Sequence, residues 1–190
     1  MSSDSLTSDS LTNDRLTHAS HWRLLRHCHR GQVPGDWRPW LEDRGSLTRR
    51  LVARGGGDFR VEILRQLVDR PTAAEARALG LPPGRRAMIR EVILWGRSRP
   101  WVFARSIIPL TTLTGRQRRL RQLDDRPLGQ VLFSDNSMRR GPVAVARIPG
   151  ATLPAPVTAP GTRLWGRRSV FHLDGKPLLV AEIFLPDFNP

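Results

Sequence analysis

Two pairs of alternating apolar segments, each joined by a short turn, constrain the fold of this chain most. Residues 86–95 and 101–108 form the first pair, and residues 164–173 and 176–185, which flank Asp174-Gly175, form the second. Asp-Gly between two such segments is a strong signal for a two-residue β-hairpin turn. Further strands are predicted at 59–67 and 143–148, and helices at 46–51, 72–79 and 114–123. Hairpins with helices inserted between them predict an α+β protein with an antiparallel sheet.

Charged residues interrupt the apolar faces of two of these strands. Arg90 and Glu91 fall on opposite faces of segment 86–95, and Glu182 falls within an apolar face of segment 176–185. Segment 86–95 is mostly apolar on both faces, which predicts a central strand. A buried charge is costly unless it is paired or bonded. Each group therefore needs a partner, which is either another side chain in a structural Arg–Glu pair or a bound ligand. A position at an edge of the sheet, where the groups stay solvated, is the third possibility, and the pattern alone leaves all three open.

The chain is strongly basic, with 31 Lys and Arg against 17 Asp and Glu and a formal net charge of +14. The positive electrostatic field of such a chain attracts nucleic acid or a small anion. The arginines of residues 116–121 most simply form a solvated helix face, with nucleic-acid contact as the alternative. Arg167 and Arg168 are adjacent on a predicted strand, so alternation directs them to opposite faces. One of them is expected to add positive potential to a pocket.

The chain length of 190 residues fits one domain preceded by a tail. Residues 3–17 repeat a five-residue polar unit three times, too polar to form a core. We therefore expect a disordered repeat tail over 1–19 and a folded domain over 20–190. No apolar run reaches the roughly 18 residues of a membrane span, and no signal peptide is recognisable. With Cys28 as the single cysteine, we expect a cytoplasmic protein without disulfide or metal site.

Several segments, in a fixed order over about residues 22–190, resemble the chorismate pyruvate-lyase family. They include Leu41-Glu42-Asp43 before Ser46-Leu47-Thr48, Arg90-Glu91, Pro127-Leu128-Gly129, Leu164-Trp165-Gly166-Arg167-Arg168-Ser169, and Lys176-Pro177-Leu178-Leu179 before Glu182. Each piece alone is weak, but the ordered set is specific. The resemblance implies a six-stranded antiparallel sheet with helical flaps that cover a buried ligand site.

The resemblance also implies an activity and its residues. The family cleaves chorismate to 4-hydroxybenzoate and pyruvate, the first committed step of ubiquinone biosynthesis, as a carbon–oxygen lyase. It acts as a monomer and needs no cofactor or metal, and no nucleic-acid partner is implied. Arg90 matches the residue that binds the ring carboxylate, and the backbone amides of Leu47 and Leu128 match two further contacts to it. Glu182 matches the proton-transfer group. Two of the three charged residues that strand parity singles out, Arg90 and Glu182, are thus the two that the family uses.

The alternative function is a non-catalytic domain of the same fold that senses small carboxylates. The fold resembles the effector-binding domains of some bacterial transcription regulators, which bind such ligands without converting them. Two features depart from the family pattern. Leu47 stands where Met is frequent, which a backbone contact tolerates. The connection 149–161 is longer than usual and is expected to be a surface loop.

Overall fold

The structure is a computed structural model that describes residues 21–190, so the tail predicted over 1–19 lies outside the described residues. The strands are β1 (Arg23–Leu24), β2 (Phe59–Asp69), β3 (Ala87–Gly96), β4 (Arg99–Pro109), β5 (Arg139–Arg140), β6 (Ala144–Pro149), β7 (Arg163–Leu173) and β8 (Lys176–Phe184). The α-helices are α2 (Arg38–Glu42), α3 (Leu47–Gly55), α4 (Ala73–Leu79) and α5 (Leu128–Phe133). The 3-10 turns are η1 (Leu25–His27), η2 (Arg30–Gln32), η3 (Gly115–Gln122) and η4 (Gly150–Thr152).

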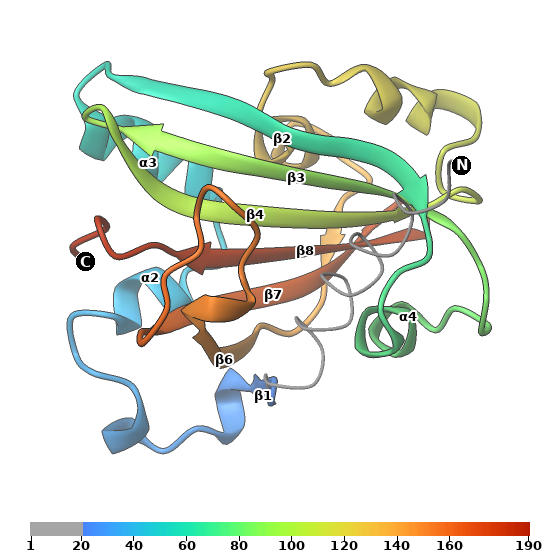
Figure 1. Cartoon of the computed structure of the whole chain (residues 1–190). Coiled ribbons are helices and arrows are strands. Elements are labelled where there is room, and N and C mark those ends of the chain that lie inside the picture. The colour runs from blue at the N-terminus through green and yellow to red at the C-terminus, as the bar shows by residue number, and fades with distance from the viewer. Residues whose placement is uncertain (1–20) are drawn as a thin grey trace, which may run out of the picture.

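One antiparallel sheet contains all the strands of the described chain, in the order β1-β6-β7-β8-β4-β3-β2, with β5 added alongside β7 (Figure 1). The α+β class is therefore confirmed, but the sheet has eight strands where six were predicted. The two additional strands, β1 and β5, are two residues long. A strand of two residues has no alternating pattern that a sequence could display.

Both predicted hairpins are present, with two-residue turns. Asp174 and Gly175 join β7 to β8 at φ values of 50° and 76°, and Arg97 and Ser98 join β3 to β4 at 50° and 58°. A positive φ at both central positions is typical of a type I′ turn, which matches the twist of the flanking strands. The first turn has the favoured Asp-Gly sequence. The second turn is shorter than the five residues, 96–100, that separate the two predicted strands. The sequence did not indicate so short a turn, because Arg-Ser is not a usual pair for its central positions.

The helices predicted at 46–51 and 72–79 are α3 and α4, and each begins at a hydroxyl cap. Ser46 Oγ accepts a hydrogen bond from the Arg49 amide at 3.3 Å, and Thr72 Oγ1 accepts one from the Glu75 amide at 3.2 Å. The helix predicted at 114–123 is instead the 3-10 helix η3. Its buried residues, Gln117 and Leu120, are three apart, and side chains three apart lie on one face of a 3-10 helix.

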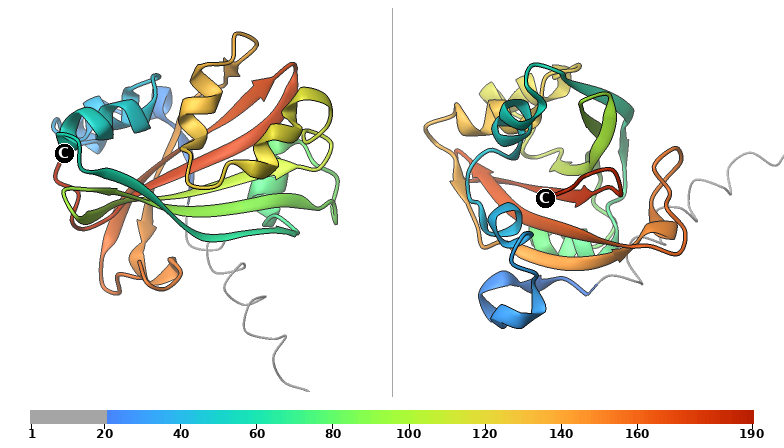
Figure 2. Two further views of the ribbon diagram at one scale, coloured as in Figure 1. Left: turned by 90° about the horizontal axis from the view of Figure 1, so that it is seen from above. Right: turned by 90° about the vertical axis from the view of Figure 1, so that its left-hand side faces the viewer.

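Helices cover both faces of the sheet. Figure 2 shows α3, η3 and α5 gathered over one face, and we call this the lid face. On the opposite face, Leu79 of α4 packs against β3, β4 and β8. The connection after β6 packs on that opposite face too, because Leu153 and Val157 are buried against Ile93 and Ile183. The prediction of a surface loop over 149–161 was therefore wrong for Leu153 and Val157. These apolar residues are isolated among Pro and Ala, so the sequence there shows neither a helical nor a strand periodicity.

A cluster of charges links β2, β3, β4 and α4 on the face opposite the lid. Glu91 is 3% exposed and accepts hydrogen bonds from Arg65 and Arg105. Arg105 Nε also donates to Glu75 Oε1 at 2.7 Å. Burial raises the pKa of the Glu75 carboxyl, but the charge of Arg105 and hydrogen bonds from Arg105 and Thr72 outweigh it, so the pKa lies below its usual value. Glu75 therefore contributes its full stabilisation at pH values above its pKa in the unfolded state. This contribution is lost as the pH falls through its lower pKa in the folded state.

We predict that replacing the shared cation of this cluster destabilises the protein strongly. Arg105→Met leaves two buried carboxylates without their common partner, and breaking a buried pair in this way costs about 3–5 kcal/mol. Urea unfolding at neutral pH measures the loss. The matched control is Arg99→Met, which removes an exposed partner of Asp187 and should cost less than about 1 kcal/mol. Equal and small losses in the two variants would contradict the role assigned to the cluster.

Candidate active site

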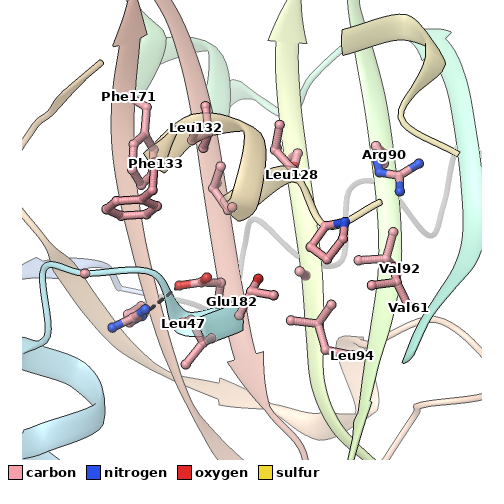
Figure 3. Close-up of a pocket in the computed structure, with 18 of the residues that line it drawn as sticks. Leu47, Val61, Arg90, Val92, Leu94, Leu128, Leu132, Phe133, Phe171 and Glu182 are labelled. Atoms are coloured by element: carbon pink, nitrogen blue, oxygen red, sulfur yellow. Dashed lines mark hydrogen bonds and ion pairs between the residues drawn. The ribbon is translucent and has the colours of Figure 1, made fainter. Parts of the chain in front are cut away.

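A cavity lies between the lid and the sheet (Figure 3). Most of its floor comes from β3, β4, β7 and β8, with single residues from β2 and β5. Its lid consists of residues at the start of α3 and along α5. Apolar side chains line most of it, among them Val92, Leu94 and Val180 from the strands and Leu47, Leu128 and Leu132 from the helices. An apolar enclosure with a few polar groups is typical of a small-molecule site.

The strand register arranges the floor of the cavity in two rows. The Arg90 row consists of Arg90, Ser106, Val180 and Ser169, which pair in turn across β3, β4, β8 and β7. The Glu182 row consists of Val92, Ala104, Glu182 and Arg167 on the same four strands. Successive strands are about 4.8 Å apart, so the ends of a row are separated by about 14 Å of sheet.

Arg90 is a buried cation at one end of its row, with an exposed fraction of 2%. Its Nη1 donates to Gln66 Oε1 at 2.9 Å, and its Nη2 donates to the backbone carbonyl of Asp124. Burial lowers the pKa of Arg90, and the nearby charges of Asp124 and Asp125 offset part of this. No carboxylate among residues 21–190 forms an ion pair with it. The guanidinium is therefore held in place by neutral acceptors and lacks a counter-ion in the described chain.

Glu182 is an ion-paired carboxylate at the other side of the cavity (Figure 3). Its Oε2 accepts a hydrogen bond from Arg167 Nε at 2.7 Å. Arg167 is 1% exposed and also donates through Nη1 to the carbonyls of Trp40, at 2.6 Å, and Asp43, at 2.9 Å. These bonds tie the chain before α3 to β7 and fix the orientation of Glu182. Its second oxygen, Oε1, has no hydrogen-bond partner in residues 21–190.

Leu47 and Leu128 are the first residues of the two lid helices. Both line the cavity, together with Thr48 and Gly129, which follow them. The first N–H groups of a helix have no partner within it, and they carry the positive end of the helix dipole. Two helix starts therefore border the same cavity from which Arg90 and Glu182 are accessible.

All four site residues predicted from the sequence, Arg90, Leu47, Leu128 and Glu182, line this cavity. Arg90 and Glu182 do not pair with each other. Glu182 has a side-chain partner in Arg167, as the structural alternative predicted, whereas Arg90 has no ion-pair partner within residues 21–190. Of the two adjacent arginines, Arg167 is the one that lines the cavity, whereas Arg168 lines a hollow on the opposite face.

The sequence interpretation missed Arg140, which also lines the cavity. It belongs to the two-residue strand β5 and lies in a polar stretch, so neither strand parity nor a family motif identifies it.

The other charged groups of interest are engaged elsewhere. Arg116 and Arg119, in the segment considered for nucleic-acid contact, form ion pairs with Asp135, and Arg116 also pairs with Asp174. Among residues 21–190, no three His, Cys, Asp or Glu side chains gather as metal ligands would. Within the same described range, no helix is long and apolar enough to cross a membrane.

Comparison with solved structures shows proteins of the same fold. The effector domain of PhnF from Mycobacterium smegmatis matches 75% of this chain and 90% of its own, with a TM-score of 0.53 and 14% identity. The C-terminal domain of the histidine utilization repressor from Pseudomonas syringae matches 70% of this chain and 94% of its own, with a TM-score of 0.54 and 11% identity. At these identities the likeness concerns the fold.

Comparison of sequences is more specific. A family model described as chorismate lyase matches residues 30–189. A probable chorismate pyruvate-lyase from Pseudomonas aeruginosa is 50% identical over 147 residues, which cover 77% of this chain and 82% of the relative. Another from Methylococcus capsulatus is 47% identical over 150 residues, covering 77% of this chain and 93% of the relative. This chain belongs to the chorismate lyase family.

Proposed function

We propose that this protein cleaves chorismate to 4-hydroxybenzoate and pyruvate, with Arg90 binding the ring carboxylate and Glu182 acting as the proton-transfer group. The observation that carries the proposal is the enclosed cavity, which places a buried arginine without a counter-ion and an oriented carboxylate on one face of the sheet, two strands apart. A 4-hydroxybenzoate has its carboxylate and its hydroxyl at opposite ends of a flat ring. The cavity has the matching polar groups on opposite sides and apolar walls between them.

Arg90 suits the ring carboxylate because its guanidinium is planar and donates through two nitrogens. A carboxylate accepts such a pair of hydrogen bonds in its own plane, which a lysine cannot reproduce. The backbone amides of Leu47 and Leu128 supply further donors at the helix starts. Their position at the lid means that a bound carboxylate would connect the sheet to both lid helices.

The reaction itself is an elimination. The bond between the ring carbon and the ether oxygen breaks, and the ring loses the proton from the carbon that carries the hydroxyl. The electron pair of that C–H bond completes the aromatic ring, and the released enolpyruvate takes up a proton to become pyruvate. Glu182 lies across the cavity from Arg90, where its hydrogen bond from Arg167 orients it, and it is the group to which the proposal assigns the proton transfer. A positioned group of this kind contributes about 10²–10⁴-fold to the rate.

The remaining parts of the proposal follow from the chemistry and from the family. Formation of an aromatic ring drives the elimination, so the reaction calls for no redox partner, and we propose that the protein works without metal or cofactor. We also propose that it acts as a monomer in the cytoplasm, at the first committed step of ubiquinone biosynthesis. A site closed to water strengthens the electrostatic contacts inside it, which here include that of Arg90 to the ring carboxylate.

The first test is incubation of the purified protein with chorismate alone, with pyruvate and 4-hydroxybenzoate both measured over time. Equal amounts of the two products, formed in step with the loss of chorismate, are expected. Unchanged chorismate together with tight binding of 4-hydroxybenzoate would overturn the lyase and favour the alternative, a sensor of small carboxylates.

We predict that Glu182→Gln lowers kcat far more than it weakens product binding. The amide keeps an acceptor for Arg167 but cannot take up a proton, so kcat should fall by about 10²–10⁴-fold. Calorimetric affinity for 4-hydroxybenzoate should stay within a few-fold, and urea unfolding checks that the buried Arg167 has not destabilised the fold. Turnover close to that of the wild type would remove Glu182 from the proton-transfer role.

We predict that Arg90→Lys weakens 4-hydroxybenzoate binding by more than about 1 kcal/mol, because the planar fork is lost while the charge is kept. Calorimetry measures the dissociation constant. Leu128→Ala is the matched control: it keeps the backbone amide that the proposal recruits, so it should change the affinity comparatively little. The assignment would fail if Arg90→Lys bound the product normally, or if Leu128→Ala abolished binding.

A further inference from the structure

We propose that Arg140 binds the second carboxylate of chorismate, the one on the enolpyruvyl group, and so distinguishes the substrate from the product. The inference rests on the proposed function. Chorismate carries two carboxylates, and the contacts assigned so far hold the ring carboxylate and the ring hydroxyl. The enolpyruvyl carboxylate leaves with pyruvate, so a residue that holds it touches the substrate but not 4-hydroxybenzoate.

Arg140 lies at the end of the Arg90 row that is remote from Arg90. Its Nε donates to Ser169 Oγ at 3.1 Å, and Ser169 is the last member of that row. Its Nη1 donates to the carbonyls of Asp43 at 3.2 Å and Gly45 at 3.3 Å, in the chain that leads into α3. The two guanidinium groups thus approach one cavity from opposite ends of a row that spans four strands.

The side chain of Arg140 is oriented but not neutralised. Its Cζ lies 5.1 Å from the ring centroid of Phe171, so stacking adds to the three hydrogen bonds that fix it. Its Nη2 forms no hydrogen bond within residues 21–190, and its partners there are a hydroxyl and two carbonyls. The nearby carboxylate Glu182 is bonded to Arg167. The guanidinium group therefore keeps one nitrogen, Nη2, able to donate, on a side chain that is already oriented. Such an arrangement suits the binding of a carboxylate.

The electrostatics of the cavity agree with a doubly charged ligand. The charged residues that line it are Arg90, Arg140, Arg167 and Glu182, which together leave two positive charges without a counter-ion. Burial and the positive charge of Arg167, partly offset by Glu182, lower the pKa of Arg140 to about 10. Placing an anion beside such a desolvated cation is favourable. Chorismate is a dianion, whereas 4-hydroxybenzoate offers one carboxylate.

A purely structural role for Arg140 predicts a different outcome from the proposed one. Its bonds to Asp43, Gly45 and Ser169 anchor the chain before α3, so a structural residue would support the lid for every ligand. In that case its loss would weaken the binding of chorismate and 4-hydroxybenzoate alike. If Arg140 instead holds the enolpyruvyl carboxylate, its replacement weakens the binding of chorismate and leaves the binding of 4-hydroxybenzoate unaltered.

The test compares both ligands in Arg140→Met, Arg140→Lys and the control Arg139→Met. Arg139 is the exposed neighbour on β5, so its replacement makes the same change in net charge outside the cavity. We expect Arg140→Met to raise KM for chorismate by roughly 10- to 100-fold, the effect of losing one charge-assisted contact. Its dissociation constant for 4-hydroxybenzoate should stay within about twofold, by calorimetry. Arg140→Lys should recover part of the loss, and Arg139→Met should behave as the wild type.

Several results would overturn the inference. An unchanged KM in Arg140→Met would remove Arg140 from substrate binding, and an equal loss for both ligands would assign it the structural role. In either case a wild-type protein that converts chorismate leaves the proposed function intact. If the wild type does not convert chorismate, the proposed function fails instead. Chorismate affinity is then measured by calorimetry, where a selective loss in Arg140→Met still supports the contact.

Discussion

A strand that is covered on both faces cannot leave a charge unpartnered, and β3 carries two charges side by side. Arg90 and Glu91 are 2% and 3% exposed and point to opposite faces of the sheet. Glu91 meets Arg65 and Arg105 in the cluster that ties four elements together. Arg90 meets only neutral acceptors within the described chain, and we propose that its charge serves to bind a ligand. Because the two residues are adjacent on one strand, the charge that stabilises the fold and the charge proposed to bind a ligand lie on opposite faces of the sheet.

The lid depends on the same sheet through its arginines. Arg167 bonds Glu182 and two carbonyls near the start of α3, and Arg140 bonds two carbonyls in the same segment. The residues that present charge to the cavity are thus the ones that position its cover. A ligand that neutralises them would act on both the floor and the lid, without any movement of the central strands.

Strand parity and turn chemistry were sufficient to predict the hairpins and the central strand, and to single out Arg90 and Glu182 as charges within apolar strand faces. Only the register of the sheet places both on one face. The family resemblance added Leu47 and Leu128, whose proposed role lies in the backbone and has no side-chain signal. Arg140 was beyond both approaches, because a two-residue strand shows no period and only the fold brings it next to Ser169. The 3-10 form of η3 and the burial of Leu153 and Val157 were missed for a related reason. Each depends on packing against residues distant in the sequence.

The surplus of arginine in the cavity has a kinetic consequence. The protein carries a net charge of +14, and the cavity adds uncompensated cations at the proposed site. The attraction felt by an approaching anion grows with its charge. A dianion is drawn in more strongly than either of the monoanions into which it is split. The electrostatic field of the protein thus favours binding of the dianionic substrate over rebinding of the monoanionic products, and it acts before any hydrogen bond is formed.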